Sequence, residues 1–446
     1  MNMHAATQAH GASNPDLNAP SSLHARHSAW KGAFVVPAFR WFAGAQAIAF
    51  TVLVAQMIVR SWMVQEETGS PFLVSLVPSL QLLPSLVLGF AGGEIADRFD
   101  RRKVVFWGEL IMFSAYGSLA VLALMGTATA WTVLATTGLI GVSYALASPS
   151  RQALIVDTVP RAIERRAIGS YMLVMHVTLL MAPALAGGLI AAFDVATALW
   201  VTAVLCCLPL PIYLRLRLQA NPAPMRRAGS MLRSLREGVG HIAANPSLRW
   251  MFAVLLVAVL FVNTWGAMFA PIAEQVLHRG AAGLSAITLA VGIGAIVGAV
   301  GSIAMEGRVS DRAQQLIFGI AFSLLIVAVA LSPNFELTLV LTVITSAVGA
   351  PFFINNMVAS QAETDERFRA RVVSVRYVVL AVQPIGMIAL GAAAEAVGPQ
   401  PAMAGSTAIG AALLLAVFGV LARTRRSGVG QPAVESASPG FVQAAD

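Results

Sequence analysis

Charged residues are scarce in this sequence. Asp, Glu, Lys and Arg make up 11% of its 446 residues, whereas 57% of them are hydrophobic. Soluble domains carry about 25% charged residues, so this composition excludes a soluble catalytic domain. The net charge is +8. Because the basic residues lie in the connections between apolar segments, as in membrane proteins, we expect no nucleic-acid partner.

Cysteine is almost absent. Cys206 and Cys207 are adjacent in one apolar segment, a spacing that suits packing and not a disulfide framework or a metal site. The H-E-x-x-H and G-x-S-x-G motifs are missing, as is an embedded pair of acids. The sequence therefore predicts no catalytic residue, no metal and no cofactor, and a polytopic membrane enzyme is the alternative from a different class.

Long apolar runs dominate what is present. About 20 apolar residues cross a hydrocarbon core about 30 Å thick. Twelve such segments occur, starting near residues 40, 71, 104, 130, 168, 195, 250, 283, 315, 335, 372 and 401. The sequence thus predicts an all-α integral membrane protein with twelve transmembrane helices.

Basic residues predict the orientation of these segments. Of 29 Lys and Arg, only Arg60 and Arg279 fall in the odd-numbered connections, so the positive-inside rule places both termini in the cytoplasm. Residues 1–34 lack an apolar signal region. We expect a multi-pass protein of the bacterial cytoplasmic membrane, in contact with lipid.

The chain divides into five parts. We expect disordered tails at residues 1–36 and 425–446, six-helix halves at 37–216 and 249–424, and a cytoplasmic linker at 217–248. Met231, Leu232, Leu235 and Val239 fall on one face of a linker helix, which predicts an amphipathic helix on the lipid surface.

The two halves repeat each other. Asp97 and Arg98 follow the second segment, and Asp311 and Arg312 follow the eighth at an offset of 214 residues, with Gly307 completing the second frame. Pseudo-symmetric six-helix halves are typical of secondary transporters, which bind substrate between the halves.

The stretch "GGEIADRFDRRK" at 92–103 resembles the loop 2-3 signature of the major facilitator superfamily. Further stretches, "SMLRSLREGVGHIAANPSLRWMF" and "QAETDERFRARVVSV", are similar to the branch that contains the enterobactin exporter and macrolide efflux proteins. The resemblance covers residues 35–425 and implies the major facilitator fold.

This resemblance implies a conformational latch for the outward-facing state, formed by Gly89, Gly93, Asp97, Arg98, Arg101 and Arg102. Gly89 and Gly93 would let the eleventh helix approach the second. Asp97 would then lie at the positive N-terminal end of the eleventh helix, near residues 371–373. The alternative is a basic loop that only fixes orientation.

Acids on neighbouring loops are the expected partners of the latch arginines. Asp157 and Glu164 are the nearest by topology. Asp100 stands where the superfamily signature has Gly, so it competes with Asp97 for these arginines.

The fifth segment, "LLMAPALAGGLIAAF", resembles an exporter-associated motif. Pro183 and Gly187 retain the pattern, while Ala182 and Ala186 replace glycines. Generic packing of small residues is the alternative interpretation.

Polar residues within apolar segments are candidates for substrate and proton binding. The substrate-cavity candidates are Gln46, Gln56, His176, Asn263, Trp265, Asn355, Asn356 and Gln383. Glu109 is the proton-coupling candidate, although it could instead snorkel to the headgroups or meet Arg102. For each polar side chain, a hydrogen bond between neighbouring helices is the alternative.

These features predict a monomeric, proton-driven exporter of a small amphiphilic molecule, such as a siderophore or a drug. Uptake remains the alternative within the same class, because neither the repeat nor the latch specifies direction. A nutrient sensor is a third possibility that usually adds a long cytoplasmic tail.

Overall fold

The computed structural model describes residues 33–218, 231–305 and 310–426. Within these ranges every regular element is helical. Twelve helices are long and apolar enough to cross a membrane, which confirms the predicted number, and they start within a few residues of the predicted positions. Each half contributes six of them.

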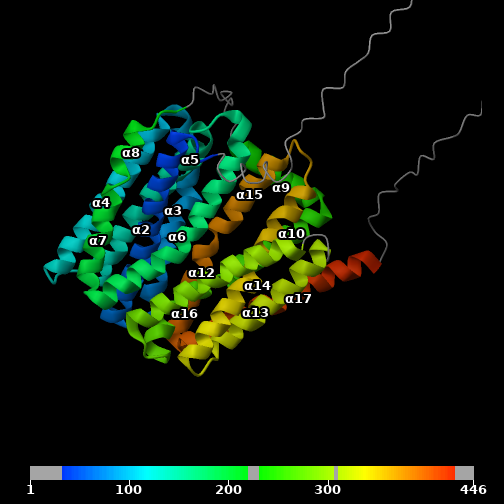
Figure 1. Ribbon diagram of the computed structural model, residues 1–446. Coiled ribbons are helices and arrows are strands. Elements are labelled where there is room, and N and C mark those ends of the chain that lie inside the picture. The colour runs from blue at the N-terminus through cyan, green and yellow to red at the C-terminus, as the bar shows by residue number, and fades with distance from the viewer. Residues whose placement is uncertain (1–32, 219–230, 306–309, 427–446) are drawn as a thin grey trace, which may run out of the picture.

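The first half occupies the left side of Figure 1. Its helices are α2 (Pro37–Thr68), α3 (Pro71–Arg98), α4 (Arg101–Leu124), α5 (Ala130–Asp157), α6 (Glu164–Ala192), α7 (Val195–Cys207) and α8 (Leu210–Arg215), with a short helix at Arg161–Ile163. The sixth span comprises α7 and α8.

The second half lies to the right, in green through yellow to red (Figure 1). Its α-helices are α10 (Pro246–Val257), α11 (Phe269–Pro271), α12 (Gly280–Met305), α13 (Asp311–Ala330), α14 (Phe335–Ala362), α15 (Arg369–Ala381), α16 (Gln383–Val397) and α17 (Pro399–Arg426). Within the seventh span, π-helical turns at Ala258–Val262 and Ile272–Val276 and a 3₁₀ turn at Trp265–Met268 interrupt the α-helical geometry.

Glycines bring corresponding helices together in both halves. A Cβ on Gly92 of α3 would lie 2.7 Å from the Ala145 carbonyl oxygen of α5, and one on Gly298 of α12 would lie 2.9 Å from Ala347 Cα of α14. At such short distances only the hydrogen atom of a glycine fits, and a larger side chain would clash. The pairs α3–α5 and α12–α14 are therefore packed alike, as the internal repeat predicts.

Broken helices meet within the second half. The eleventh span divides at Val382 into α15 and α16, and Gln383 Nε2 donates to the Asn263 carbonyl oxygen at 2.8 Å. Asn263 lies between the π-helical and 3₁₀ turns of the seventh span. Because broken helices leave backbone groups unpaired, this side chain compensates for a carbonyl freed by the break.

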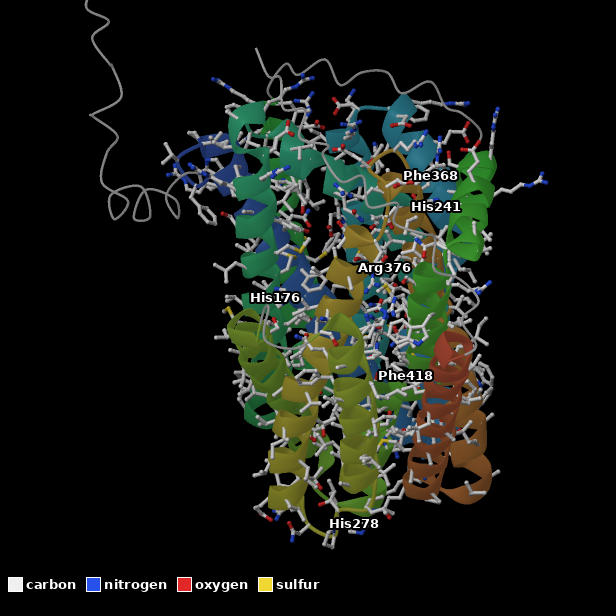
Figure 2. All side chains as sticks on the ribbon, turned by 90° about the vertical axis from the view of Figure 1, so that its right-hand side faces the viewer. His176, His241, His278, Phe368, Arg376 and Phe418 are labelled. Carbon is white, nitrogen blue, oxygen red and sulfur yellow. The ribbon has the colours of Figure 1, made fainter. Side chains whose placement is uncertain are left out.

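The linker helix α9 (Met231–Ala244) packs on the protein and not only on lipid. Gly238 lies against the Arg371 carbonyl oxygen of α15, and the His241 ring stacks on Phe368 with centroids 4.4 Å apart (Figure 2). Val239, predicted on the apolar face, is 52% exposed. The glycine side of α9 therefore packs on α15, and the lipid contact of its apolar face stays a prediction.

We call the two ends of the bundle cytoplasmic and external after the orientation predicted from basic residues. The cytoplasmic end holds the start of α2, the α3–α4 turn, α9 and the start of α15. The external end holds the α2–α3 turn and the end of α16.

Candidate functional site

The halves are joined at the external end. Four hydrogen bonds connect described residues of the two halves: Ser70 Oγ to Glu395 Oε2, Phe72 N to Glu395 Oε2, Ser79 Oγ to the Pro384 carbonyl oxygen, and Gln275 Nε2 to the Gly69 carbonyl oxygen. Three lie at or beside the α2–α3 turn, and the Ser79 bond lies deeper in the bundle. The external end is therefore closed.

Small residues make this closure tight. A Cβ on Gly391 of α16 would fall 2.6 Å from Ser75 Cβ of α3. Gly187, predicted as part of the fifth-segment motif, lies opposite Ser285 of α12, whose side chain a Cβ at Gly187 would overlap. Pro183 is buried on the same helix. The motif thus lies where α6 of one half meets α12 of the other.

The latch residues are apart from the second half in this state. No heavy atom lies within 4 Å of a Cβ built on Gly89 or Gly93. The Asp97 side chain is 69% exposed, and its Oδ1 atom lies 4.0 Å from Arg101 Nη2 on the adjoining helix. The structure therefore does not bring Asp97 to the start of α15, and the latch contact stays a prediction.

Arginines of this loop pair within the first half. Arg101 Nη1 lies 2.8 Å from Asp157 Oδ2 at the end of α5, and Arg98 pairs with Glu94 of α3. Arg102 binds Asp100, whose Oδ1 also accepts from the Arg102 backbone N–H at 3.0 Å. Asp100 therefore caps α4.

Asp100 has an ordinary backbone conformation, with φ of −60°, so the turn does not need the signature glycine. Its hydrogen bond with the Arg102 guanidinium holds the pKa of the Asp100 carboxyl below its usual range. The carboxylate therefore keeps its charge and contributes stability above its unfolded pKa. That contribution is lost as the pH falls through the lower folded pKa.

The counterpart loop in the second half differs. Gly307 lies outside the described residues, and Asp311 is the first residue of α13. Arg312 Nη2 donates to Ser247 Oγ at 2.6 Å, which ties α13 to the start of α10 within the same half.

Glu109 forms a buried ion pair. Its Oε1 lies 2.8 Å from Arg151 Nη2 of α5, with the two side chains 1% and 9% exposed, and Cys206 Sγ of α7 lies 3.8 Å from Oε2. The two alternatives for Glu109, an approach to the headgroups and a contact with Arg102, do not occur in this structure, because α4 turns this face toward α5 and α7. An acid that is paired within the bundle can bind a proton and give up its ion pair with the arginine.

Arg60 is also buried, so its assignment to an external connection was wrong. It lies inside α2 with 0% exposure. Its guanidinium donates to the Gln56 carbonyl oxygen, Thr137 Oγ1 and Gln81 Oε1, at 3.0, 2.7 and 2.8 Å, and it lies 5.7 Å from the Tyr116 ring centroid. Arg60 therefore ties four helices together inside the first half.

Four of the cavity candidates are bonded inside one half. Gln46 donates to the Tyr213 hydroxyl, and Gln56 donates to Thr202 Oγ1. Asn355 donates to Gln314 Oε1. Asn356 donates to the Met251 carbonyl oxygen and accepts from Arg376 Nη1 of α15. These contacts are interhelical bonds, the alternative interpretation for each.

The remaining candidates differ. His176 is exposed on α6 (Figure 2), and its Nδ1 lies 2.7 Å from the Met172 carbonyl oxygen. Asn263 and Gln383 are partly exposed at the helix breaks. These three stay candidates for a cavity between the halves.

Trp265 is a core residue and not an exposed stacking platform. It is 6% exposed and packs edge-to-face on Phe269 and Phe322, with ring centroids 4.9 and 6.2 Å away. Such pairs stabilise packing beyond area burial alone.

Trp265→Ala is expected to destabilise the protein by about 3 kcal/mol, because it empties a space between aromatic rings. Thermal unfolding of the purified protein checks this. Trp131→Ala is the matched control, since Trp131 is 71% exposed, and equal melting temperatures for the two variants would contradict the core assignment.

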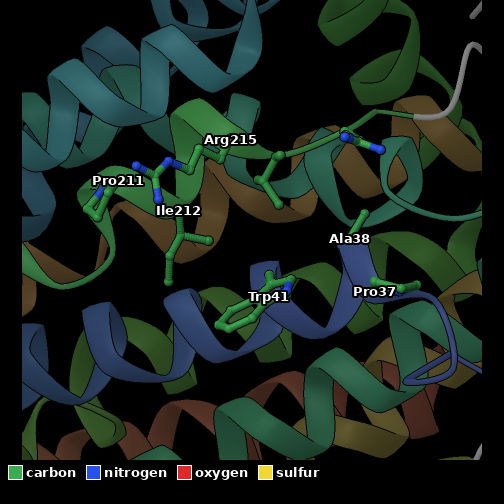
Figure 3. A pocket seen from close by; sticks show the side chains of 8 residues that line it. Pro37, Ala38, Trp41, Pro211, Ile212 and Arg215 are labelled. Atoms are coloured by element: carbon green, nitrogen blue, oxygen red, sulfur yellow. The ribbon is translucent and has the colours of Figure 1, made fainter.

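A pocket of about 420 Å³ lies between α2 and α8 at the cytoplasmic end (Figure 3). Its walls include Pro37, Trp41, Pro211 and Arg215. Its lining residues belong to the first half, apart from Arg217 at the start of the linker, so the pocket is not the space between the halves. Trp41 is 60% exposed, as expected for a side chain at the headgroup level.

Sequence reasoning did not single out several residues that bind across helices or across the two halves. Arg151 and Arg376 were counted only among the basic residues outside the odd-numbered connections, yet they lie inside α5 and α15. Glu395 and Gln275 were not singled out. An acid in the last apolar turn of the eleventh segment was the signal that could have identified Glu395.

Comparisons with known proteins agree with this architecture. A family model described as transmembrane secretion effector matches residues 28–438. Macrolide efflux protein A of Streptococcus pyogenes is 25% identical over 245 residues, which cover 53% of this chain and 57% of that protein. The chain thus spans little more than half the length of that relative.

A longer alignment joins this chain to the multidrug efflux pump Tap of Mycobacterium tuberculosis, which is 24% identical over 352 residues, or 76% of this chain and 82% of Tap. A solved bacterial homologue of the human lysosomal transporter Spinster, in an inward-facing and unoccupied conformation, shares the fold. Its TM-score is 0.65 at 18% identity, covering 89% of this chain and 99% of that one. This chain belongs to the transmembrane secretion effector family of the major facilitator superfamily.

Proposed function

We propose that this protein is a proton-coupled exporter of small amphiphilic molecules, with drugs as the leading substrate class. One observation carries the mechanism: three of the four hydrogen bonds between described residues of the two halves lie at the external end and the fourth lies deeper in the bundle, while the latch residues of the cytoplasmic end are apart from the second half. Halves that meet at one end can rock to meet at the other. This conformation is inward-facing.

Membership of the secretion effector family supports export over uptake, as do the relatives described as efflux proteins. Siderophores remain a second substrate class within export. We further propose that the protein works as a monomer in the bacterial cytoplasmic membrane, with both termini inside and no catalytic activity.

The Glu109–Arg151 pair supports the proton-coupling part of the proposal. Glu109 and Arg151 are a carboxylate and guanidinium 2.8 Å apart in a buried site. Protonation of Glu109 would remove the charge that holds Arg151, and it would free α4 and α5 to shift relative to each other. Uptake of a proton on one side of the membrane and its release on the other would thereby drive the rocking of the two halves.

Mass spectrometry of small molecules inside and outside cells tests the proposed function. Cells with and without the gene are compared, first under iron limitation and then after loading with amphiphilic drugs. We expect at least one compound to accumulate inside only when the gene is missing. Accumulation inside that requires the gene would contradict export and support uptake.

Asp97→Asn is expected to lower transport about tenfold while leaving membrane insertion intact, because the neutral amide binds a helix N-terminus more weakly. Efflux from loaded cells, normalised to protein in the membrane, measures the effect. Glu94→Gln is the matched control near the same end of α3, because it removes an exposed acid that pairs with Arg98 and leaves Asp97 unchanged. Normal efflux by Asp97→Asn would reject the latch.

A further inference from the structure

Glu395 reaches across the halves to the first turn of α3. It lies in the last turn of α16 and belongs to the second half. Its Oε2 atom accepts a hydrogen bond from Ser70 Oγ at 2.8 Å and another from Phe72 N at 3.3 Å. These bonds join the external ends of the second and eleventh spans.

The Glu395 carboxylate is a suitable hydrogen-bond acceptor for the N-terminal end of α3. The first N–H groups of a helix have no intrahelical partner and carry partial positive charge. Pro71 has no N–H, so Phe72 presents the first free amide of α3, while the Ser70 side chain accepts from Leu73 N at 3.2 Å. A residue of the opposite half therefore completes the cap of α3.

A neighbouring bond holds the same turn. Gln275 Nε2, at the external end of the seventh span, donates to the Gly69 carbonyl oxygen at 2.6 Å. Gly69 has φ of 60°, a left-handed conformation that ends α2 and aims the turn toward α3. The α2–α3 turn is thus bound from two separate spans of the second half.

The contact has the same form as the predicted cytoplasmic latch. Asp97 lies near the C-terminal end of α3, and its expected partner is the N-terminal end of α15 in the eleventh span. Glu395 lies near the C-terminal end of the eleventh span and binds the N-terminal end of α3. The same two spans therefore carry one acid each, at opposite ends of the bundle.

We propose that Glu395 is an external latch, a positioning residue that holds the inward-facing state and releases when the external end opens. In this structure Glu395 is bound while the Asp97 side chain is 69% exposed. The two acids would take turns, and each would stabilise the state in which the other is free. This inference rests on the proposed alternating access.

Thiol labelling from outside intact cells tests the latch without a substrate. Ser285→Cys supplies the reporter, because Ser285 is 7% exposed and faces Gly187 across the closed external end. A membrane-impermeant thiol reagent would reach position 285 when this end opens. Mass spectrometry of the labelled peptide separates it from the native cysteines.

Glu395→Ala is expected to raise the labelling rate about tenfold, because both hydrogen bonds and the charge are lost. Glu395→Gln keeps an acceptor oxygen and loses only the charge, so a rise of about threefold is expected. Glu336→Gln is the matched control, since Glu336 is an exposed external acid that lies 3.6 Å from Arg279 of its own half. It should leave labelling unchanged.

Two further variants test the hydrogen-bond partner of Glu395 and the opposing cytoplasmic latch. In a Ser70→Ala background the effect of Glu395→Ala should shrink, because one of its two partners is already gone. Asp97→Asn should lower labelling, since it favours the inward-facing state.

Unchanged labelling in Glu395→Ala, with lowered labelling in Asp97→Asn, would overturn the external latch and leave alternating access standing. Unchanged labelling in all variants would reject both latches. Thermal unfolding of each purified variant shows that the protein is folded, so a merely structural role would appear as lost stability without altered labelling.

Discussion

Gly391→Val is expected to abolish transport by holding the external end open. A Cβ at this position lies 2.6 Å from Ser75 Cβ and 3.3 Å from Phe72 Cα, closer than side chains pack. The valine methyls extend farther, so α3 and α16 must separate. Overpacking costs about 1 to 3 kcal/mol, which shifts a conformational equilibrium by roughly five- to 150-fold.

The matched control for this substitution is Gly405→Val in α17. No heavy atom lies within 4 Å of a Cβ on Gly405, so the added side chain faces open space. Efflux from loaded cells and labelling at position 285 measure the two consequences. Wild-type efflux by Gly391→Val, at equal protein in the membrane, would show that close approach of α3 and α16 is not required.

Glu109→Gln is expected to lower proton-driven transport more than tenfold, because an amide cannot take up and release the proton. Its partner Arg151 would remain buried, 9% exposed, without a counter-charge. Removing one member of a buried ion pair costs about 3 to 5 kcal/mol. Loss of activity from instability must therefore be separated from loss of coupling.

The double substitution Glu109→Gln and Arg151→Gln separates these effects. It removes both charges, so stability should recover relative to Glu109→Gln, whereas proton-driven transport should stay low. Glu336→Gln controls for the loss of an acid elsewhere. Restored pH-driven transport in the double variant would contradict the assignment of proton coupling to Glu109.

The architecture could be predicted from the sequence because a membrane places strict demands on composition. Each span needs about 20 apolar residues, and these runs are long enough to be located without tertiary information. The start of α3 at Pro71 and the start of α7 at Val195 coincide with predicted positions, since Pro and Asp residues mark helix starts. The repeated Asp-Arg frame predicted the two halves.

Buried charges could not be placed in the same way. A long side chain near an apolar run can reach either the lipid headgroups or a neighbouring helix. This ambiguity applies to Arg60, Arg151 and Arg376. Hydropathy does not separate these outcomes. The partners of Arg151 and Arg376 are Glu109 of α4 and Asn356 of α14, and helix packing alone brings them together.

Contacts between the halves depend on the conformational state, which no single sequence motif specifies. The loop 2-3 motif predicted the cytoplasmic contact of Asp97, whereas the structure shows the external contact of Glu395. The two observations concern opposite ends of the same pair of spans.

The position of Trp265 could not be predicted for a different reason. An aromatic side chain in the middle of a helix can line a cavity or fill a core, and the contacts of Trp265 with the Phe269 and Phe322 rings show the latter.

Transport by the purified protein in sealed liposomes tests the central claim, proton-coupled export, most directly. The fluorescent amphiphilic cation ethidium serves as the probe, and a pH gradient is imposed in either direction before and after addition of a protonophore. We expect ethidium to move against its gradient only when protons flow the opposite way, and we expect the protonophore and Glu109→Gln each to stop it. Movement that continues after the pH gradient collapses, or that runs in the direction of proton flow, would contradict proton-coupled export.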